Sequence, residues 1–120
     1  MKRGPQTLDF LDSDFPDEGI HIDVMEIITG IKGLGSIEVA RNRLDPYVVL
    51  FKNQIQINAY KQALISFKQI ERMIFLPNKQ NPYAMRIYPS RSKHTYSFTI
   101  LDQELLVRIF NYISARQITD

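Results

Sequence analysis

Apolar and polar residues alternate along most of the chain from residue 20 onward. Alternation with a period of two places successive side chains on opposite faces of a strand, so that one face can be buried. The segments with this pattern, or with a short apolar run between turn residues, are 20–25, 37–40, 48–51, 54–58, 64–67, 70–76, 83–88 and 96–101. The pattern predicts a mainly β fold of about seven antiparallel strands, arranged as a barrel or a sandwich.

The last part of the chain changes to a helical period. Its apolar residues at i, i+1, i+4, i+5 and i+8 form one stripe. They are Leu105, Leu106, Ile109, Phe110 and Ile113. Asp102 stands where an N-cap is expected, and Glu104 and Arg116 complement the two ends of the helix dipole. We therefore expect one helix over residues 103–116, whose apolar stripe closes an open end of the β structure.

Residues 1–19 differ from the rest of the chain in charge and in pattern. They hold two basic and five acidic residues, a net charge of −3, whereas the remainder holds 13 basic and eight acidic residues. This segment has no stable period, so we expect a flexible acidic arm, followed by one domain over residues 20–120. Aromatic residues among carboxylates suit contacts with a basic partner. The candidates in the arm are Phe10, Asp14 and Phe15.

Composition limits the classes of function. The chain has 120 residues and no cysteine, which suits a single domain without disulfides or thiolate metal sites. His21 and His94 are far apart in sequence, and no metal-ligand spacing or phosphate-binding loop accompanies them. We therefore expect a non-enzymatic protein with no metal and no cofactor. No apolar run approaches the roughly 20 residues of a membrane span, so no transmembrane segment is expected.

Between residues 28 and 101 the sequence resembles one family. The resemblance is carried by residues 28–37 with Arg43, by the strand pair around 48–57, and by 66–77, which ends Arg-Met-Ile-Phe-Leu-Pro. These stretches are similar to the PH-like middle domains of histone chaperones, of the FACT small-subunit type, within the wider pleckstrin-homology (PH) superfamily. The resemblance implies a PH-like barrel or sandwich closed by one C-terminal helix. It also implies a chromatin-associated module that binds histones or another chaperone subunit, with a nuclear location expected and a cytoplasmic one as the alternative.

Basic residues of the later strands and turns supply the first candidate surface. Arg86 and Tyr88 share one face of an expected strand, because side chains two residues apart point the same way. A guanidinium beside an aromatic ring is a frequent recognition device. Arg91 and Lys93 stand in the polar loop that follows. As a set, these four residues are candidates for contact with a protein partner, with weak nucleic-acid contact as a further option.

Lys32, Arg41 and Arg43 form an alternative candidate, an anion site. Phosphoinositide-binding PH domains carry a lysine in the first hairpin and a basic–x–arginine pair on the next strand, and these residues follow that order. Converging cations hold phosphate through charge-assisted hydrogen bonds. Two alternatives to histone binding therefore stay open. One is a phosphoinositide-binding PH domain, and the other is a PH-like interaction scaffold that docks an acidic peptide or subunit of a larger complex.

Overall fold

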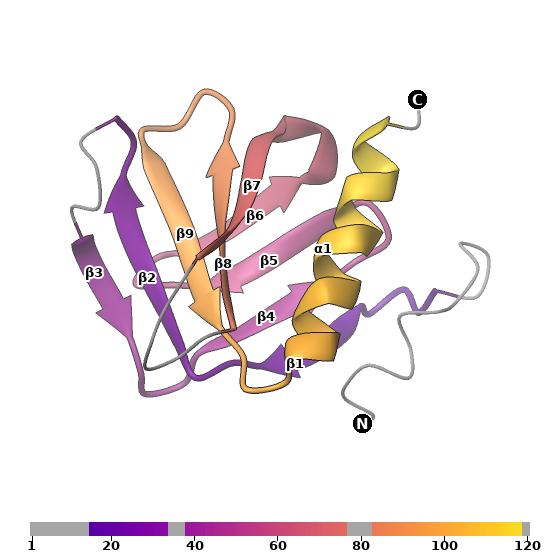
Figure 1. The fold of residues 1–120 in the computed structure, drawn as a ribbon, viewed down its shortest axis with the longest axis horizontal. Coiled ribbons are helices and arrows are strands. Elements are labelled where there is room, and N and C mark those ends of the chain that lie inside the picture. The colour runs from indigo at the N-terminus through magenta and orange to yellow at the C-terminus, as the bar shows by residue number, and fades with distance from the viewer. Residues whose placement is uncertain (1–14, 34–37, 77–82, 119–120) are drawn as a thin grey trace.

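Two antiparallel sheets and one C-terminal helix make up the fold in this computed structural model (Figure 1). The structure describes residues 15–33, 38–76 and 83–118. One sheet has the strand order β1 (Ile20–Asp23), β4 (Tyr47–Leu50), β5 (Gln54–Asn58) and β6 (Gln62–Ser66). The other has the order β3 (Glu38–Asn42), β2 (Glu26–Ile31), β9 (His94–Thr99), β8 (Ala84–Pro89) and β7 (Ile70–Leu76). A 3-10 turn, η3 (Phe67–Gln69), precedes β7, and the helix is α1 (Gln103–Ile118).

The first hairpin passes from one sheet to the other. β1 pairs with β4 so that Ile20 lies opposite Leu50, and the β2–β3 ladder continues this register with a shift of one residue. At the bend between the two ladders, the Val24 amide donates a hydrogen bond to the Pro46 carbonyl (3.2 Å). The hairpin thus has two long extended segments, and each gives one strand to each sheet. The first segment contains β1 and β2, and the second contains β3 and β4. About seven strands were predicted and the described residues hold nine; β2, which follows the bend, is the strand that lies outside all the predicted segments.

The two sheets form a sandwich and are not closed into a barrel. Within the described residues no ladder joins β6 to β7, and η3 connects these two strands. The prediction of a mainly β fold with one C-terminal helix is confirmed. Of the predicted barrel or sandwich, the structure shows the sandwich.

Alternation along the strands produces the core between the sheets. Ile55 and Ile57 of β5 are fully buried, whereas the glutamines on either side of Ile55 are half-buried. The five-stranded sheet contributes its own fully buried side chains, which are Ile27, Met85, Ile87 and Phe98. Removing an apolar side chain of this size from water contributes about 1.5–3 kcal/mol. The apolar layer formed by both sheets therefore holds them together.

The helix α1 covers one side of the sandwich, as Figure 1 shows. It begins after Asp102, whose Oδ1 accepts a hydrogen bond from the Leu105 amide (3.1 Å). Leu106, Ile109 and Ile113 of its apolar stripe are at most 2 % exposed. The helix predicted over residues 103–116 is confirmed, and it extends to residue 118. In the parts of the chain that the structure describes, no helix combines the length and the apolar character needed to cross a membrane.

The chain immediately before β1 packs against this helix. Phe15 is 7 % exposed, and its ring stacks on Tyr112 of α1 with 5.4 Å between the centroids. The Gly19 amide donates to the Pro16 carbonyl (3.0 Å), which closes a turn before β1. The folded part therefore includes residues 15–19, which the sequence pattern assigned to the arm. Residues 1–14, including the arm candidates Phe10 and Asp14, lie outside the described residues.

Candidate binding surface

Three side chains from β7 and β8 meet on the outer face of the five-stranded sheet. The antiparallel register places Arg72 opposite Tyr88, and Arg86 lies two residues from Tyr88 on the same face. The guanidinium carbon of Arg72 lies 4.2 Å from the centroid of the Tyr88 ring. Arg86 Nη1 donates to the Tyr88 hydroxyl (3.3 Å), while Arg86 Nε donates to Ser97 Oγ of β9 (3.1 Å). We call Arg72, Tyr88 and Arg86 the arginine–tyrosine cluster.

Positive charge dominates the arginine–tyrosine cluster. Within the described residues, the contacts of Arg72 and Arg86 are with the Tyr88 side chain and with Ser97, and neither arginine has a carboxylate partner. Burial by itself raises the pKa of the Tyr88 phenol. Hydrogen bonds from Arg86 and Arg72, together with their charges, outweigh that effect and lower the pKa of Tyr88. Two guanidiniums without a counter-charge on one face suit a carboxylate or a phosphate.

The two other cations predicted with this set lie on the turn between β8 and β9. Arg91 and Lys93 are exposed, and Arg91 takes a left-handed backbone conformation with φ 58°. The backbone of Lys93 holds the end of β2, because its carbonyl accepts from the Lys32 amide (2.8 Å). Among the described residues, no hydrogen bond or ion pair joins these two side chains to Arg86 or Tyr88. The structure thus brings together two of the four predicted residues and adds Arg72 to them.

The cations of the alternative anion site each have acidic partners. Arg41 pairs with Glu38 and with Glu26 (3.3 Å), and Arg43 Nε lies 2.8 Å from the same Glu26 carboxylate. The hydrogen bond from Arg41 lowers the pKa of Glu38. Arg41 and Arg43 therefore do meet, as predicted, but they meet around carboxylates. An incoming anion would have to compete with those carboxylates for the two arginines.

Lys32 lies with a different group of residues. Its Nζ is 2.7 Å from Glu71 Oε1 at the start of β7, and it donates to the Pro89 carbonyl at the end of β8 (2.5 Å). These contacts differ from those of Arg41 and Arg43, which lie along β3 and just after it. The side chain of Lys32 therefore connects β2 to the β7–β8 pair.

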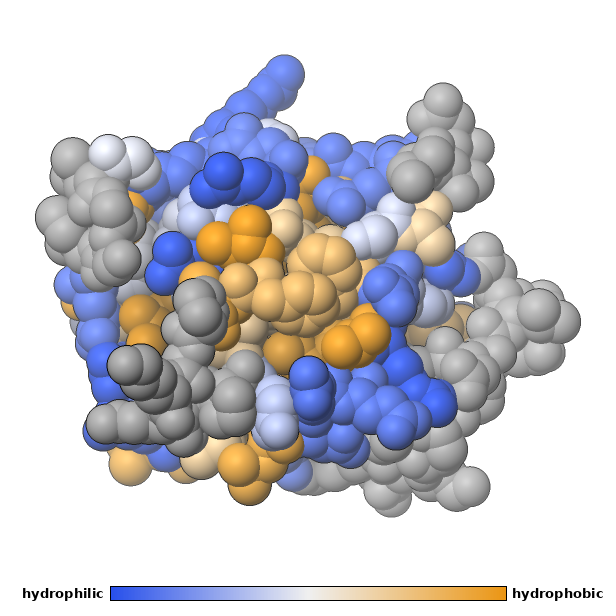
Figure 2. Space-filling view, viewed as in Figure 1, coloured by the Kyte–Doolittle hydropathy of each residue, from blue (hydrophilic) through white to orange (hydrophobic). Residues whose placement is uncertain are grey.

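An apolar surface adjoins the arginine–tyrosine cluster, between β7 and α1. Phe75 of β7 is 45 % exposed and stacks on Phe110 of α1, with 4.3 Å between ring centroids and 22° between ring planes. Val107, one turn earlier on the helix, is 37 % exposed, and Met73 is half-buried. Figure 2 shows apolar side chains gathered at the centre of this face of the molecule, with hydrophilic ones around them. Aromatic and aliphatic groups that stay this accessible suit contact with a partner.

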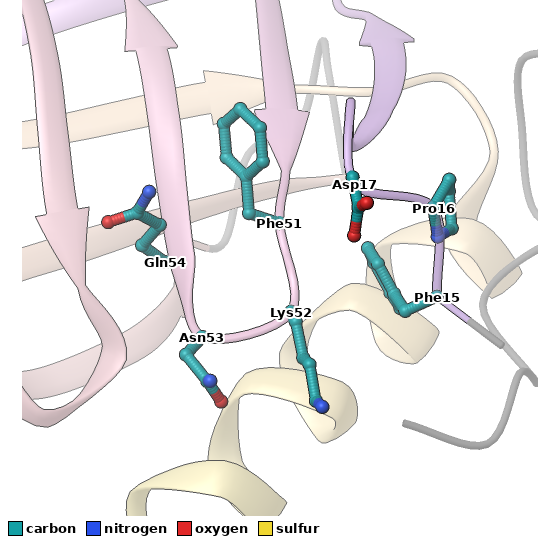
Figure 3. Close-up of a pocket in the computed structure, with 7 residues that line it drawn as sticks. All are labelled: Phe15, Pro16, Asp17, Phe51, Lys52, Asn53 and Gln54. Atoms are coloured by element: carbon teal, nitrogen blue, oxygen red, sulfur yellow. The ribbon is translucent and has the colours of Figure 1, made fainter. Parts of the chain in front are cut away.

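A pocket of about 470 Å³ lies where the N-terminal segment meets the turn between β4 and β5 (Figure 3). It is lined by Phe15, Pro16 and Asp17 on one side and by Phe51, Lys52, Asn53 and Gln54 on the other. Its walls are mostly polar, and its charged groups are one acid and one base. Within the described residues, no group of three or more potential metal ligands lies together, here or elsewhere.

The comparisons with known proteins address the fold. No family model and no curated protein matches the sequence. Among solved structures, the chain is similar to Inner Membrane Complex Sub-compartment Protein 3 from Toxoplasma gondii. The two are 13 % identical with a TM-score of 0.54, over 98 % of this chain and 87 % of that one. At this identity the likeness shows that the fold is shared.

Arg72 is the member of the cluster that strand periodicity did not single out. Periodicity assigns residues to faces within one strand, whereas Arg72 of β7 contacts Tyr88 on the neighbouring strand β8. The expected pairing of the two strands in a hairpin could have identified Arg72. Strands at 70–76 and 83–88 that pair symmetrically about residue 80 place residue 72 opposite residue 88, and this is the observed register.

Proposed function

We propose that this chain is a non-catalytic protein-interaction domain on a PH-like scaffold, which binds an acidic segment of a partner through the arginine–tyrosine cluster. The observation that carries the proposal is the pair of guanidiniums, Arg72 and Arg86, without a carboxylate partner in the described residues. Arginine and tyrosine are both enriched among the residues that contribute most binding energy near the centres of protein interfaces. Tyr88 holds both arginines in place before a partner arrives, which reduces the entropy lost on binding.

The strand arrangement supports a PH-like scaffold. The bent hairpin consists of two long segments, and each counts as a single strand when the bend is ignored. The nine strands then become seven, followed by one C-terminal helix. This is the arrangement that the sequence resemblance implies.

The resemblance to histone chaperones points to a chromatin protein as partner and to a nuclear location. A basic cluster favours an acidic segment of a chaperone subunit over a histone, because histones are themselves basic. Histone contact would fall instead to the acidic arm, whose candidates Phe10 and Asp14 lie outside the described residues. We therefore place an acidic chaperone partner first and histone binding second.

Affinity for an acid-rich peptide tests the proposal. The double variant Arg72→Glu/Arg86→Glu is expected to weaken binding at least about tenfold, because it replaces two attractive charges with repulsive ones. Lys52→Glu/Lys61→Glu is the matched control, since it makes the same change in net charge at exposed positions away from the cluster. Equal losses in the two double variants would mean that general charge, and not the cluster, attracts the peptide.

The same variants test whether histones bind through the arginine–tyrosine cluster. A pull-down of core histones at about physiological ionic strength, repeated at several times that value, distinguishes loose charge attraction from packed contacts. If the domain retains histones at high salt, and Arg72→Glu/Arg86→Glu leaves that retention intact, a different surface binds histones. Histone binding would then replace binding of an acidic partner as the first proposed function.

A further inference from the structure

β7 forms a border of the five-stranded sheet and pairs with β8 on one side. In an antiparallel pair, every second residue directs its N–H and C=O away from the neighbouring strand. Within the described residues, no strand pairs with the other side of β7. Gln117 of α1 occupies only the start of that side, where its side-chain amide donates to the carbonyls of Phe67 (3.3 Å) and Ile70 (2.8 Å). From residue 71 to residue 76, the backbone groups on that side have no hydrogen-bond partner among the described residues.

The two faces beside this border differ in chemistry. On the outer face, Arg72 stands over the Tyr88 ring. On the other face, Phe75 stacks on Phe110 of α1, and Val107 extends the apolar surface along the helix. Side chains of an added strand alternate between these two faces. Residues next to Arg72 are therefore favoured when acidic, and those next to Phe75 when apolar.

We propose that the partner segment binds as an extended strand added to β7, with acidic and apolar residues at alternating positions; this inference rests on the proposed function. The acidic side chains face Arg72 and Arg86, and the apolar ones pack on Phe75, Phe110 and Val107. Main-chain hydrogen bonds to β7 give affinity, and the two faces give selectivity. Charge complementarity commits the occupant to an acidic partner, because a second copy of β7 would bring two arginine-bearing faces side by side.

Two peptides of equal composition test the alternation. One alternates Asp or Glu with Leu, Phe or Val over about nine residues, the length of a long strand. The other has the same residues as an acidic block followed by an apolar block. Isothermal titration calorimetry with the full chain is expected to give a Kd about tenfold lower for the alternating peptide, because it satisfies both faces at once.

N-methylation of the alternating peptide tests the main-chain pairing. One version carries N-methyl groups at the odd residues and the other at the even residues. A strand paired along one border needs the N–H groups of one set, so one version is expected to lose about tenfold or more in affinity while the other binds nearly as before. Equal losses, or no loss in either version, would overturn pairing with β7.

A variant pair of the protein tests the apolar face. Val107→Asp is expected to weaken the alternating peptide and to leave the block peptide nearly unchanged. Leu64→Asp is the control, because Leu64 is exposed on β6 of the other sheet. Equal Kd values for the two peptides, with binding still lost in Arg72→Glu/Arg86→Glu, would overturn the strand arrangement and leave the proposed function standing. Failure of both peptides to bind would overturn the proposed function itself.

Discussion

Phe15, which precedes the first strand, stacks on Tyr112 of the C-terminal helix with 5.4 Å between the ring centroids. Phe67 of η3 meets the same tyrosine edge-on, at 6.1 Å. The Tyr112 hydroxyl donates to the Lys52 carbonyl in the turn between β4 and β5 (3.2 Å). Tyr112 therefore connects the helix to the N-terminal segment, to η3 and to the turn between β4 and β5.

Truncation of Phe15 tests how much this contact contributes. Phe15→Ala is expected to lower the free energy of unfolding by about 3 kcal/mol, because it leaves a cavity beneath the helix. Tyr60→Ala is the control, since Tyr60 is 74 % exposed and its truncation is expected to cost within about 0.5 kcal/mol. Urea unfolding followed by circular dichroism measures both. Similar values for the two variants would show that Phe15 contributes no packing energy.

Substitution of two glycines with similar φ angles distinguishes the cost of backbone strain from the cost of side-chain crowding. Gly19 has φ 79° and Gly33 has φ 77°. A Cβ at Gly19 would lie 2.7 Å from Val49 Cγ1 and 2.9 Å from Phe51 Cδ1, whereas nothing lies within 4 Å at Gly33. Gly33→Ala is expected to cost about 1 kcal/mol from the left-handed backbone alone, and Gly19→Ala about 2–3 kcal/mol. Equal shifts in the urea midpoint would contradict the crowding at Gly19.

The pH dependence of stability should report on Tyr112. Burial raises the pKa of Tyr112 to about 12, above the value near 10 of an unfolded chain. Between those values the unfolded state releases the phenolic proton and the folded state keeps it, so stability falls as pH rises. Between about pH 8 and about pH 11, the wild-type chain is expected to lose about 1 kcal/mol more than Tyr112→Phe. Parallel losses in the two proteins would mean that the phenol titrates normally.

The start of α1 depends on the Asp102 side chain. Its Oδ1 accepts from the Leu105 amide, one of the four amides that lack a partner in the first turn. Asp102→Ala is expected to lower stability by about 1 kcal/mol, whereas Asp102→Ser retains an acceptor and most of that stability. Thermal unfolding of the two variants measures the difference. A loss in the serine variant equal to that in the alanine variant would argue against capping.

The sequence predicted the elements well because each depends on neighbouring residues. The apolar stripe and the Asp102 cap were sufficient to place α1, and alternation was sufficient to identify the buried residues of β5. The strand that the pattern missed is β2, which follows the bend near Val24 and Pro46, where the chain leaves one sheet for the other. The first predicted segment ends at residue 25, and the pairing of residues 26–31 with β3 and β9 becomes visible only in the folded sheet.

The candidate sites show a similar division. Arg86 and Tyr88 lie on one strand, and their shared face followed from spacing alone. For Arg41 and Arg43 the decisive neighbour is Glu26, which approaches from β2 and becomes visible only when the strands are paired. The burial of Phe15 also depends on a distant partner, the helix at the other end of the chain.

The bent first hairpin has a consequence for cooperativity. Because β1 and β2 are one continuous segment paired along its length with β3 and β4, neither sheet can open without disturbing the other. The protein is therefore expected to have no half-folded state in which one sheet survives. Amide protons of β5 and β9, which lie in different sheets, should exchange with solvent through the same global opening and with the same free energy.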